Sequence, residues 1–273
     1  QQFPRPKLCA GWITPRVFDL LGVSPRQYPH GLLTFKRLIC FVKNRRLSIV
    51  TRQYSVRRYE FDAWLLQQAG VPVIQHTVKT IRRDGPYYVV DDRYRAKYLV
   101  GAGGTHCPVY RHFFRAIRPH APKARIMTVE EEFKCEDHDP NCYLWFFENG
   151  LPGYSWYVPK ANGYVNIGVG GKEQRLKKTG QTINQHWQWF QQKLMRSGLV
   201  PDRRFVPRGH VYYIRRSPPL QQDRLYLTGD AAGLATVDMG EGIRPAIESG
   251  LRAASAIVNQ TPYRMPFGAK YSW

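Results

Sequence analysis

The feature that most constrains this chain is a strand, a turn of small residues and a helix that follow one another between residues 224 and 258. Residues 225–227 (Leu-Tyr-Leu) have the composition of a buried strand, and residues 242–258 space their apolar side chains as a helix does. The turn at residues 229–233 reads Gly-Asp-Ala-Ala-Gly. Small side chains let a backbone approach a ligand closely, and Asp230 offers a carboxylate, so the pattern predicts a site that binds ligand hydroxyls.

The start of the predicted helix is a second candidate binding element. Residues 240–243 read Gly-Glu-Gly-Ile, and the unpaired amides and positive dipole end of a helix favour a phosphate or a partly anionic ring edge. Glycines that serve only the packing of strand, turn and helix would give the same pattern. Because glycine inside an element costs stability unless something requires it, two such elements in one segment favour a ligand site.

Residues 229–233 and 240–243, with Ser249-Gly250 on the helix, resemble the flavin motif of the flavoprotein monooxygenase superfamily, and within it most closely that of the geranylgeranyl reductase family. The resemblance implies that the cofactor is FAD, that Asp230 binds its ribityl chain, and that the amides of residues 240–243 face the flavin ring. Residues 58–62 match the family's arginine-to-aspartate motif, which implies that Arg58 lies near the dinucleotide. The cofactor-binding residues implied in this way are Arg58, Gly229, Asp230, Gly240, Glu241, Gly242 and Ile243.

Two further motifs resemble the reductases in particular. Residues 6–11, which contain Cys9, are similar to their cysteine and glycine loop, although Ala10 replaces a glycine. Residues 153–160 resemble their Tyr-x-Trp-x-Phe-Pro motif, with Val158 in place of Phe. The resemblance implies that Cys9, Tyr154 and Trp156 are the catalytic residues. The thiol would relay a proton or shape the pocket, and the two rings would wall an apolar substrate channel. The alternatives are that Cys9 is a small packing residue and that the aromatic residues belong to the core of a sheet.

One part of the family pattern is missing from the chain. A complete family member begins with a strand, a Gly-x-Gly-x-x-Gly turn and an acidic residue that holds the adenosine end of FAD. The first residues of this chain contain no such turn. We expect the chain to be a fragment of a longer flavoprotein. The alternatives are that the missing unit lies on another chain or that cofactor binding has been lost.

The remaining sequence predicts an α/β protein. Aromatic and β-branched residues broken by turn pairs predict an antiparallel sheet between residues 126 and 171, and helices are predicted at residues 59–69 and 182–195. Strands are predicted at residues 37–42, 47–54, 71–74, 78–81, 87–90 and 98–100.

We therefore expect a Rossmann-like FAD-binding domain, incomplete at its N-terminus, interleaved with an antiparallel-sheet substrate domain. The FAD-binding domain would comprise residues 1–30, 56–125 and 216–260, the substrate domain residues 31–55 and 126–215, and the C-terminal tail residues 261–273.

Charge and composition limit the classes of binding partner that we expect. The net charge of +21 favours anionic partners, and residues 1–60 carry twelve basic and two acidic side chains. An anionic membrane surface is one candidate partner, whereas nucleic acid is not expected because no nucleic-acid-binding signature is visible. Five cysteines are too few for a disulfide framework and favour a cytoplasmic location. Residues 135–142 hold two cysteines and a histidine but lack a fourth ligand for zinc, so we expect no metal.

The expected function is flavin-dependent oxidoreduction of a hydrophobic small molecule, with saturation of isoprenoid double bonds as the reaction that the resemblance favours. The electrons would come from NAD(P)H or a reductant protein. A flavin-dependent monooxygenase or halogenase would share the Gly-Asp motif but consume oxygen. The third hypothesis is that the chain is a truncated, non-catalytic protein that binds lipid or a partner.

Overall fold

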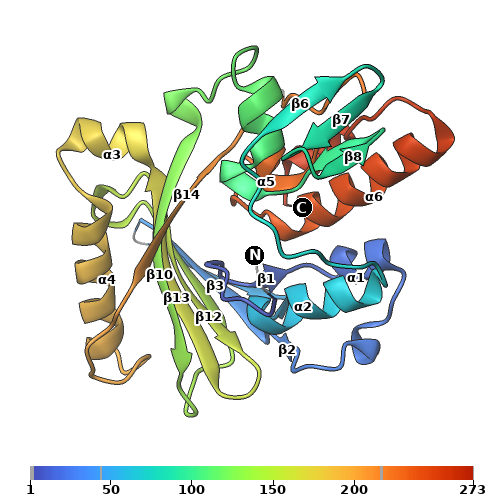
Figure 1. Cartoon of the computed structure of the whole chain (residues 1–273). Coiled ribbons are helices and arrows are strands. Elements are labelled where there is room, and N and C mark those ends of the chain that lie inside the picture. The colour runs from blue at the N-terminus through green and yellow to red at the C-terminus, as the bar shows by residue number, and fades with distance from the viewer. Residues whose placement is uncertain (1–2, 44, 216–217, 273) are drawn as a thin grey trace. The chain divides into compact units, whose positions relative to one another are not determined.

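A computed structural model describes residues 3–43, 45–215 and 218–272 (Figure 1). Contacts along the backbone divide the chain into two compact units, each built from two chain segments. Unit 1 comprises Gln1–Val73 and Ile126–Val211, and unit 2 comprises Ile74–Arg125 and Tyr212–Trp273. The chain is therefore interleaved and mixed α/β, as expected. Which stretches serve FAD and which serve the substrate stays a prediction.

A seven-stranded sheet dominates unit 1, with the strand order β14-β10-β13-β12-β11-β3-β4. The pairs β10–β13, β13–β12, β12–β11 and β3–β4 are antiparallel, which confirms the antiparallel sheet predicted for the middle of the chain. Strands β11 and β3 are parallel. The strand bounds are β3 (Arg37–Val42), β4 (Arg45–Val50), β10 (Arg125–Lys134), β11 (Cys142–Phe146), β12 (Gly153–Lys160), β13 (Tyr164–Lys172) and β14 (Arg208–Tyr213).

Helices α3 (Glu173–Thr179) and α4 (Ile183–Arg196) follow β13 and bury their apolar side chains against one face of this sheet. The predicted helix at residues 182–195 is thus confirmed. Thr182 and Gln185 form a capping box, in which each side chain bonds the other residue's backbone amide, so the helix starts where its first turn is satisfied. The core of unit 1 lies between α4 and the sheet and includes Val129, Trp145, Tyr157, Ile167, Trp187, Phe190 and Leu194.

The rest of unit 1 is a small sheet with two helices. Strands β1 (Trp12–Ile13), β5 (Tyr54–Ser55) and β2 (Leu33–Thr34) pair in that order. Helix α1 (Arg16–Leu21) ends at Gly22, whose φ of 66° suits glycine, and α2 (Arg58–Gln68) confirms the predicted helix at residues 59–69.

The predicted strand at residues 71–74 is wrong, because this stretch has no regular structure and leaves Val71, Val73 and Ile74 exposed. β-Branched composition favours a strand only where a partner strand is available, and none of the described strands pairs with this stretch.

Unit 2 contains two small sheets. In one, β16 (Leu225–Leu227) lies between β15 (Gln221–Gln222) and β9 (Leu99–Gly101), and the β16–β9 pair is parallel. In the other, β6 (Ile81–Asp84), β7 (Tyr87–Val90) and β8 (Tyr94–Ala96) form an antiparallel meander. Two helices, α5 (Gly229–Ala232) and α6 (Ile243–Asn259), follow β16. The predicted strand, turn and helix at residues 224–258 are confirmed.

Candidate functional site

The Gly-Asp turn of unit 2 is held against helix α6 by its glycines. The Thr228 amide donates to the Gly101 carbonyl (3.1 Å), so the turn begins directly after the parallel β16–β9 pair. Gly229 has a φ of +52°, and its amide donates to Ser249 Oγ of α6 (3.0 Å). A Cβ at Gly229 would lie 3.0 Å from the Cβ of Ala246. The positive φ and the close approach together explain why glycine occupies this position.

Asp230 lies beside Gly242, the residue that caps the start of α6. A Cβ built on Gly242 would lie 3.5 Å from Asp230 Oδ1, and both residues are only half-buried. The carboxylate therefore lies beside the first turn of α6, as a ligand bound by both would require.

The first turn of α6 has few donors to offer. Gly242 is the N-cap and provides no side-chain cap. The Arg244 amide donates to Glu241 Oε1 (2.6 Å), and Pro245 has no N–H. The amides of Gly242 and Ile243 are therefore the donors with which this turn could bind an electron-rich group.

Glu241 is engaged by the helix that it precedes. Its Oε2 lies 3.3 Å from Arg244 Nε, and Arg244 also approaches Glu248 (3.5 Å). Burial raises the pKa of Glu241 and outweighs the opposing effect of Arg244. This carboxylate thus caps α6 at its positive end, and its predicted contact with the cofactor stays a prediction.

The loop before α6 is fixed at several points. Gly240 has a φ of +66°, and a Cβ there would lie 2.3 Å from the hydroxyl of Tyr212. The Gly240 amide donates to the Thr236 carbonyl (3.0 Å), and the Glu241 amide donates to Thr236 Oγ1 (3.0 Å). The position of Gly240 is therefore determined by packing as well as by backbone conformation.

Three of the residues predicted from sequence lie in unit 1 around a buried acid. Arg58, at the start of α2, forms a bidentate pair with Asp62 (2.6 and 2.8 Å) and a hydrogen bond with the Cys9 side chain. The Cys9 amide donates to the carboxylate of Glu130. Trp156 lies on the same sheet face as Glu130, two strands away. The predicted roles of Cys9, Arg58 and Trp156 stay predictions, but these residues share one neighbourhood.

Trp156 and Tyr154 point to the sheet face opposite α4. The Trp156 indole donates to Asn166 Oδ1 (2.7 Å), and its ring packs on Gly168, where a Cβ would lie 2.2 Å from Cζ2. The ring of Tyr154 lies 5.7 Å from that of Trp156 and 5.4 Å from that of Phe146. Glycine at 168 is what lets the indole lie flat on the neighbouring strand.

The registers of five strand pairs place one row of side chains across this face, which we call the site face. Cross-strand partners in register carry their side chains on the same side of a sheet. The row runs Glu130, Gly168, Trp156, Leu144, Cys40 and Leu47. The site face therefore changes from acidic at β10 through aromatic at β12 to apolar at β4.

Glu130 is the residue that sequence reasoning missed. It is 3% exposed, and its Oε1 is buried without a hydrogen-bond partner. Burial raises the pKa of Glu130 from 4.5 to about 8. The signal in the sequence is that three consecutive glutamates, residues 130–132, interrupt a stretch of apolar and β-branched residues.

The second acid of this strand is paired with buried cations. Lys160 has no exposed surface, and its Nζ lies 2.5 Å from Glu132 Oε2. Arg57 Nε donates to Glu132 Oε1 (3.0 Å). Burial alone would raise the pKa of Glu132, but the bonds and charges of Lys160 and Arg57 lower it overall. Glu132 is therefore an anion, in contrast with Glu130.

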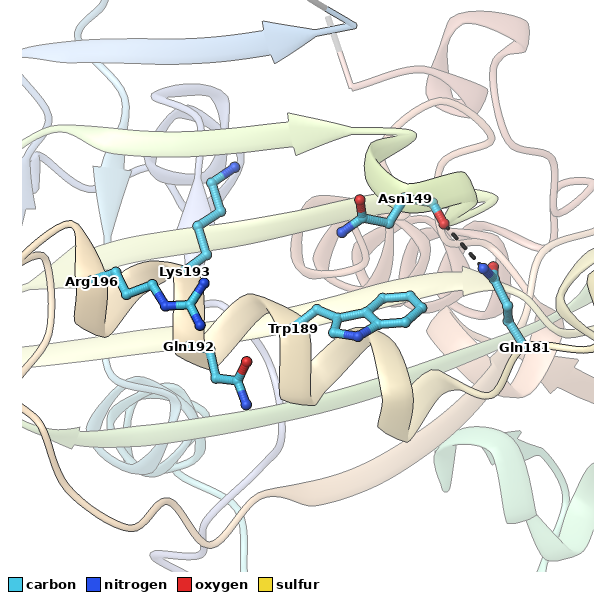
Figure 2. A pocket seen from close by; sticks show the side chains of 6 residues that line it. All are labelled: Asn149, Gln181, Trp189, Gln192, Lys193 and Arg196. Carbon is cyan, nitrogen blue, oxygen red and sulfur yellow. Dashed lines mark hydrogen bonds between the residues drawn. The ribbon is translucent and has the colours of Figure 1, made fainter.

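A shallow hollow of about 570 Å³ lies on the outer side of α4 (Figure 2). It is lined by Asn149, Gln181, Trp189, Gln192, Lys193 and Arg196. Gln181 donates to the Asn149 carbonyl (3.3 Å). None of the residues predicted from sequence lines this hollow, and it contains no acid or thiol.

The candidate zinc ligands are not arranged around a metal. Cys142 is buried in β11, and His138 Nδ1 lies 3.0 Å from the Cys135 carbonyl oxygen. Within the described part of the chain, no three His, Cys, Asp or Glu side chains gather as a metal site would need. None of the described helices combines the length and hydropathy that crossing a bilayer requires.

Comparison with known sequences gives distant relatives. No protein-family model matches the chain. The chain is 27% identical over 280 residues to an uncharacterized protein of Methanosarcina barkeri, covering 93% of this chain and 66% of that protein. It is 27% identical over 225 residues to protein CbrA of Escherichia coli K12, covering 73% and 58%. The chain thus spans about two thirds or less of the length of these relatives.

Comparison with solved structures gives a consistent fold. A geranylgeranyl bacteriochlorophyll reductase-like protein from Thermoplasma acidophilum matches with a TM-score of 0.75 at 19% identity, covering 96% of this chain and 72% of that one. The flavin-dependent halogenase CmlS matches at 0.71 and 19%, covering 96% and 53%. PqsL of Pseudomonas aeruginosa, a probable FAD-dependent monooxygenase, matches at 0.66 and 14%, covering 93% and 77%. The chain therefore has the mixed α/β fold found in flavin-dependent enzymes.

Proposed function

We propose that this chain belongs to an FAD-dependent oxidoreductase that reduces carbon–carbon double bonds of a hydrophobic, isoprenoid-type substrate. The observation that carries the proposal is that the Asp230 carboxylate lies beside the first turn of α6, where a Cβ on Gly242 would stand 3.5 Å from Asp230 Oδ1. The fold shared with flavin-dependent enzymes supports FAD as the ligand of this carboxylate and of the helix amides.

The residues of unit 2 suit the flavin half of FAD. Asp230 can accept hydrogen bonds from ribityl hydroxyls, and the amides of Gly242 and Ile243 can donate to the electron-rich edge of the ring. Bound FAD would supply the hydride for the reduction. The amides would hold the negative charge that the reduced ring carries, since helix N-termini stabilise anions.

The site face of unit 1 suits an apolar substrate. Trp156, Tyr154, Phe146 and Leu144 lie together on adjacent strands as an aromatic and apolar group, in which Trp156 and Leu144 are 5% and 2% exposed. Such a group would bind a prenyl chain through burial of apolar area and would exclude water from the reacting carbons. Cys9 and Trp156 would position the alkene.

We propose that a dinucleotide-binding unit outside the 273 residues holds the adenosine half of FAD, because the chain covers 72% and 53% of two of the structures that it resembles. NAD(P)H or a reductant protein would supply the electrons. We further propose a cytoplasmic protein that binds the anionic surface of a membrane, where a prenyl substrate is found.

An oxygen-consuming reaction is the second candidate, favoured by the likeness to CmlS at a TM-score of 0.71. The two candidates differ in their need for oxygen. A reductase saturates its substrate anaerobically once FAD is reduced, whereas a monooxygenase or halogenase forms no product without oxygen.

The test begins with the natural full-length protein. We expect it to purify with FAD, identified by chromatography after release, and to convert a geranylgeranyl lipid to a more saturated product under anaerobic conditions with dithionite. Asp230→Ala should lower the FAD content at least tenfold. Asp202→Ala, which removes an exposed carboxylate from unit 1, is the matched control. Full FAD content in the Asp230 variant, or product only with oxygen, would contradict the proposal.

A further inference from the structure

We propose that Glu130 is the proton donor of the site face, giving its carboxyl proton to a carbon of the apolar alkene. The inference rests on the proposed function, because it names the group that completes the reduction. Glu130 matches none of the motifs that point to a flavoenzyme, and its position comes from the sheet registers alone.

Glu130 is a buried acid that lies beside Trp156 and has a carboxylate oxygen without a hydrogen-bond partner. On one side its strand neighbour in register is Gly168, where a Cβ would lie 2.8 Å from the Glu130 Cβ and 2.2 Å from the Trp156 ring. Only glycine at residue 168 lets the Glu130 side chain and the Trp156 indole lie next to each other on the same sheet face. Glu130 Oε1 is buried and without a partner, which is costly unless a ligand uses it or a proton neutralises it.

The charged groups that face Glu130 come from three elements. They are Glu132 on its own strand, Lys160 on β12 and Arg58 on α2, and the Cys9 amide adds a hydrogen bond. Lys160 is paired with Glu132, and Arg58 with Asp62. Both nearby cations are thus committed to other carboxylates, so Glu130 has no counter-ion of its own. Burial then favours the neutral acid at neutral pH, with a pKa of about 8.

The reaction needs such a group. Saturating a double bond adds one hydride and one proton. Bound reduced FAD would supply the hydride, with its two electrons, to one carbon as the π bond breaks. The other carbon would take the proton as the Glu130 O–H bond breaks, which would leave Glu130 as a carboxylate. Water re-protonates Glu130, and NAD(P)H or a reductant protein restores reduced FAD.

The protonation state can be measured without turnover. Infrared spectra of the natural holoenzyme minus those of Glu130→Gln at pH 6 should show the carbonyl stretch of a neutral carboxylic acid that disappears as the pH rises through about 8. Glu131→Gln is the matched control, because Glu131 is the next residue on the opposite sheet face and bonds Arg203 there. Its difference spectrum should lack this band. An ionised Glu130 at pH 6 would overturn the proposal.

The donor role has its own readout. Glu130→Gln should lose about 100-fold or more in alkene reduction, the scale of general-acid catalysis, while keeping its FAD content and its rate of flavin reduction. Wild-type turnover should fall above about pH 8, Glu130→Asp should regain part of the rate, and Glu131→Gln should stay within twofold. Near-wild-type reduction by folded, FAD-loaded Glu130→Gln would overturn the donor role alone. Absence of FAD or of reduction in the unaltered protein would instead overturn the proposed function.

Discussion

At the scale of single residues, two glycines of the same segment have opposite roles. Gly240 precedes α6 with a φ of +66° and a close contact to Tyr212, whereas Gly250 lies inside α6 with no atom within 4 Å of its missing Cβ. We expect Gly240→Ala to destabilise the protein by about 1–3 kcal/mol, from left-handed strain and overlap. Gly250→Ala should stabilise it by about 0.5–1 kcal/mol, because alanine favours a helix. Urea unfolding measures both, and equal effects would contradict the assignment.

The pKa of Glu130 has a consequence for stability. Burial raises the pKa of this carboxyl from 4.5 to about 8 in the folded state, so the folded protein binds the proton more tightly than the unfolded chain does. Stability from this group is present below about pH 4.5 and is lost as the pH rises to about 8. Relative to Glu130→Gln, the wild type should lose up to about 1.4 kcal/mol per pH unit across this range. Parallel pH profiles of the two proteins would contradict this prediction.

Some residues of the candidate site could be predicted from the sequence and others could not. Asp230 and Gly242 could be predicted because the turn and the helix start are contiguous in the chain, so local composition marks them. Glu130 could not, because its significance depends on Gly168 and Trp156 in other strands. An acid in a strand is ordinarily a solvated side chain, and only the register places this one beside an indole.

At the scale of elements, those stabilised by residues close together in the chain could be predicted, and those that depend on distant residues could not. Helix α4 was predictable because its capping residues and apolar spacing lie within one segment. The parallel pairing of β3 with β11 joins residues 37–42 to residues 142–146, and no local pattern indicates it. That pairing is what extends the site face from Trp156 to the exposed strand β4, so the site was predicted in parts but not as one surface.

The C-terminal segment holds the loop that precedes α6. Asp238 accepts hydrogen bonds from the Ser272 amide (3.0 Å) and hydroxyl (3.0 Å), and Arg244 donates to the Tyr271 carbonyl. Burial opposes ionisation of Asp238, but the amides of Ser272 and Met239 lower its pKa overall. The contribution of this group to stability is therefore present above its ordinary pKa of 3.8 and is lost as the pH falls through its lowered value.

Breaking that contact should loosen the segment before it affects the rest of the protein. We expect Asp238→Ala to increase hydrogen exchange of the Val237 and Ser272 amides about tenfold or more, because Val237 donates to Lys270 (2.9 Å) and Ser272 to Asp238. Exchange in α4 should not change. Mass spectrometry of peptides from both regions measures this, with Asp202→Ala as the control. Unchanged exchange at residues 237 and 272 would contradict the role of Asp238.

At the scale of the whole molecule, the cofactor itself tests which part of the site the chain carries. FMN has the flavin and ribityl groups of FAD without the adenosine. If the chain binds only the flavin half, its affinities for FMN and FAD should agree within about threefold and both should be weak. A protein with an upstream strand, Gly-x-Gly-x-x-Gly turn and helix should prefer FAD by more than about tenfold, or 1.4 kcal/mol. Fluorescence titration measures these affinities. Tight stoichiometric FAD binding by residues 1–273 would contradict the proposed division.

The β3–β4 hairpin of unit 1 is basic. Residues 20–59 contain no aspartate or glutamate, and residues 36–52 contain six basic side chains. Strand β4 is one of the two edge strands of the seven-stranded sheet, and Leu47, Ile49 and Val50 are 51%, 48% and 73% exposed there. An exposed apolar edge invites pairing with a second copy, but like charges on both edges oppose it. Basic and apolar side chains together instead suit an anionic bilayer.

Basic side chains on the β4 edge should make binding to anionic vesicles sensitive to their removal. Each basic residue near an anionic surface contributes about 1 kcal/mol, so Arg45→Gln with Arg46→Gln should weaken binding to phosphatidylserine vesicles about 30-fold. Lys177→Gln with Lys178→Gln on α3 removes the same charge elsewhere and should weaken it less than threefold. Co-sedimentation at several salt concentrations measures both.

Equal losses in the two double variants would mean that total charge, and not the β4 edge, binds the lipid. Binding to neutral vesicles as strong as to anionic ones would exclude the electrostatic mechanism. Leu47 lies in the same cross-strand row as Trp156, so the edge that we propose to bind lipid and the side chains that we propose to bind the prenyl chain belong to one sheet face.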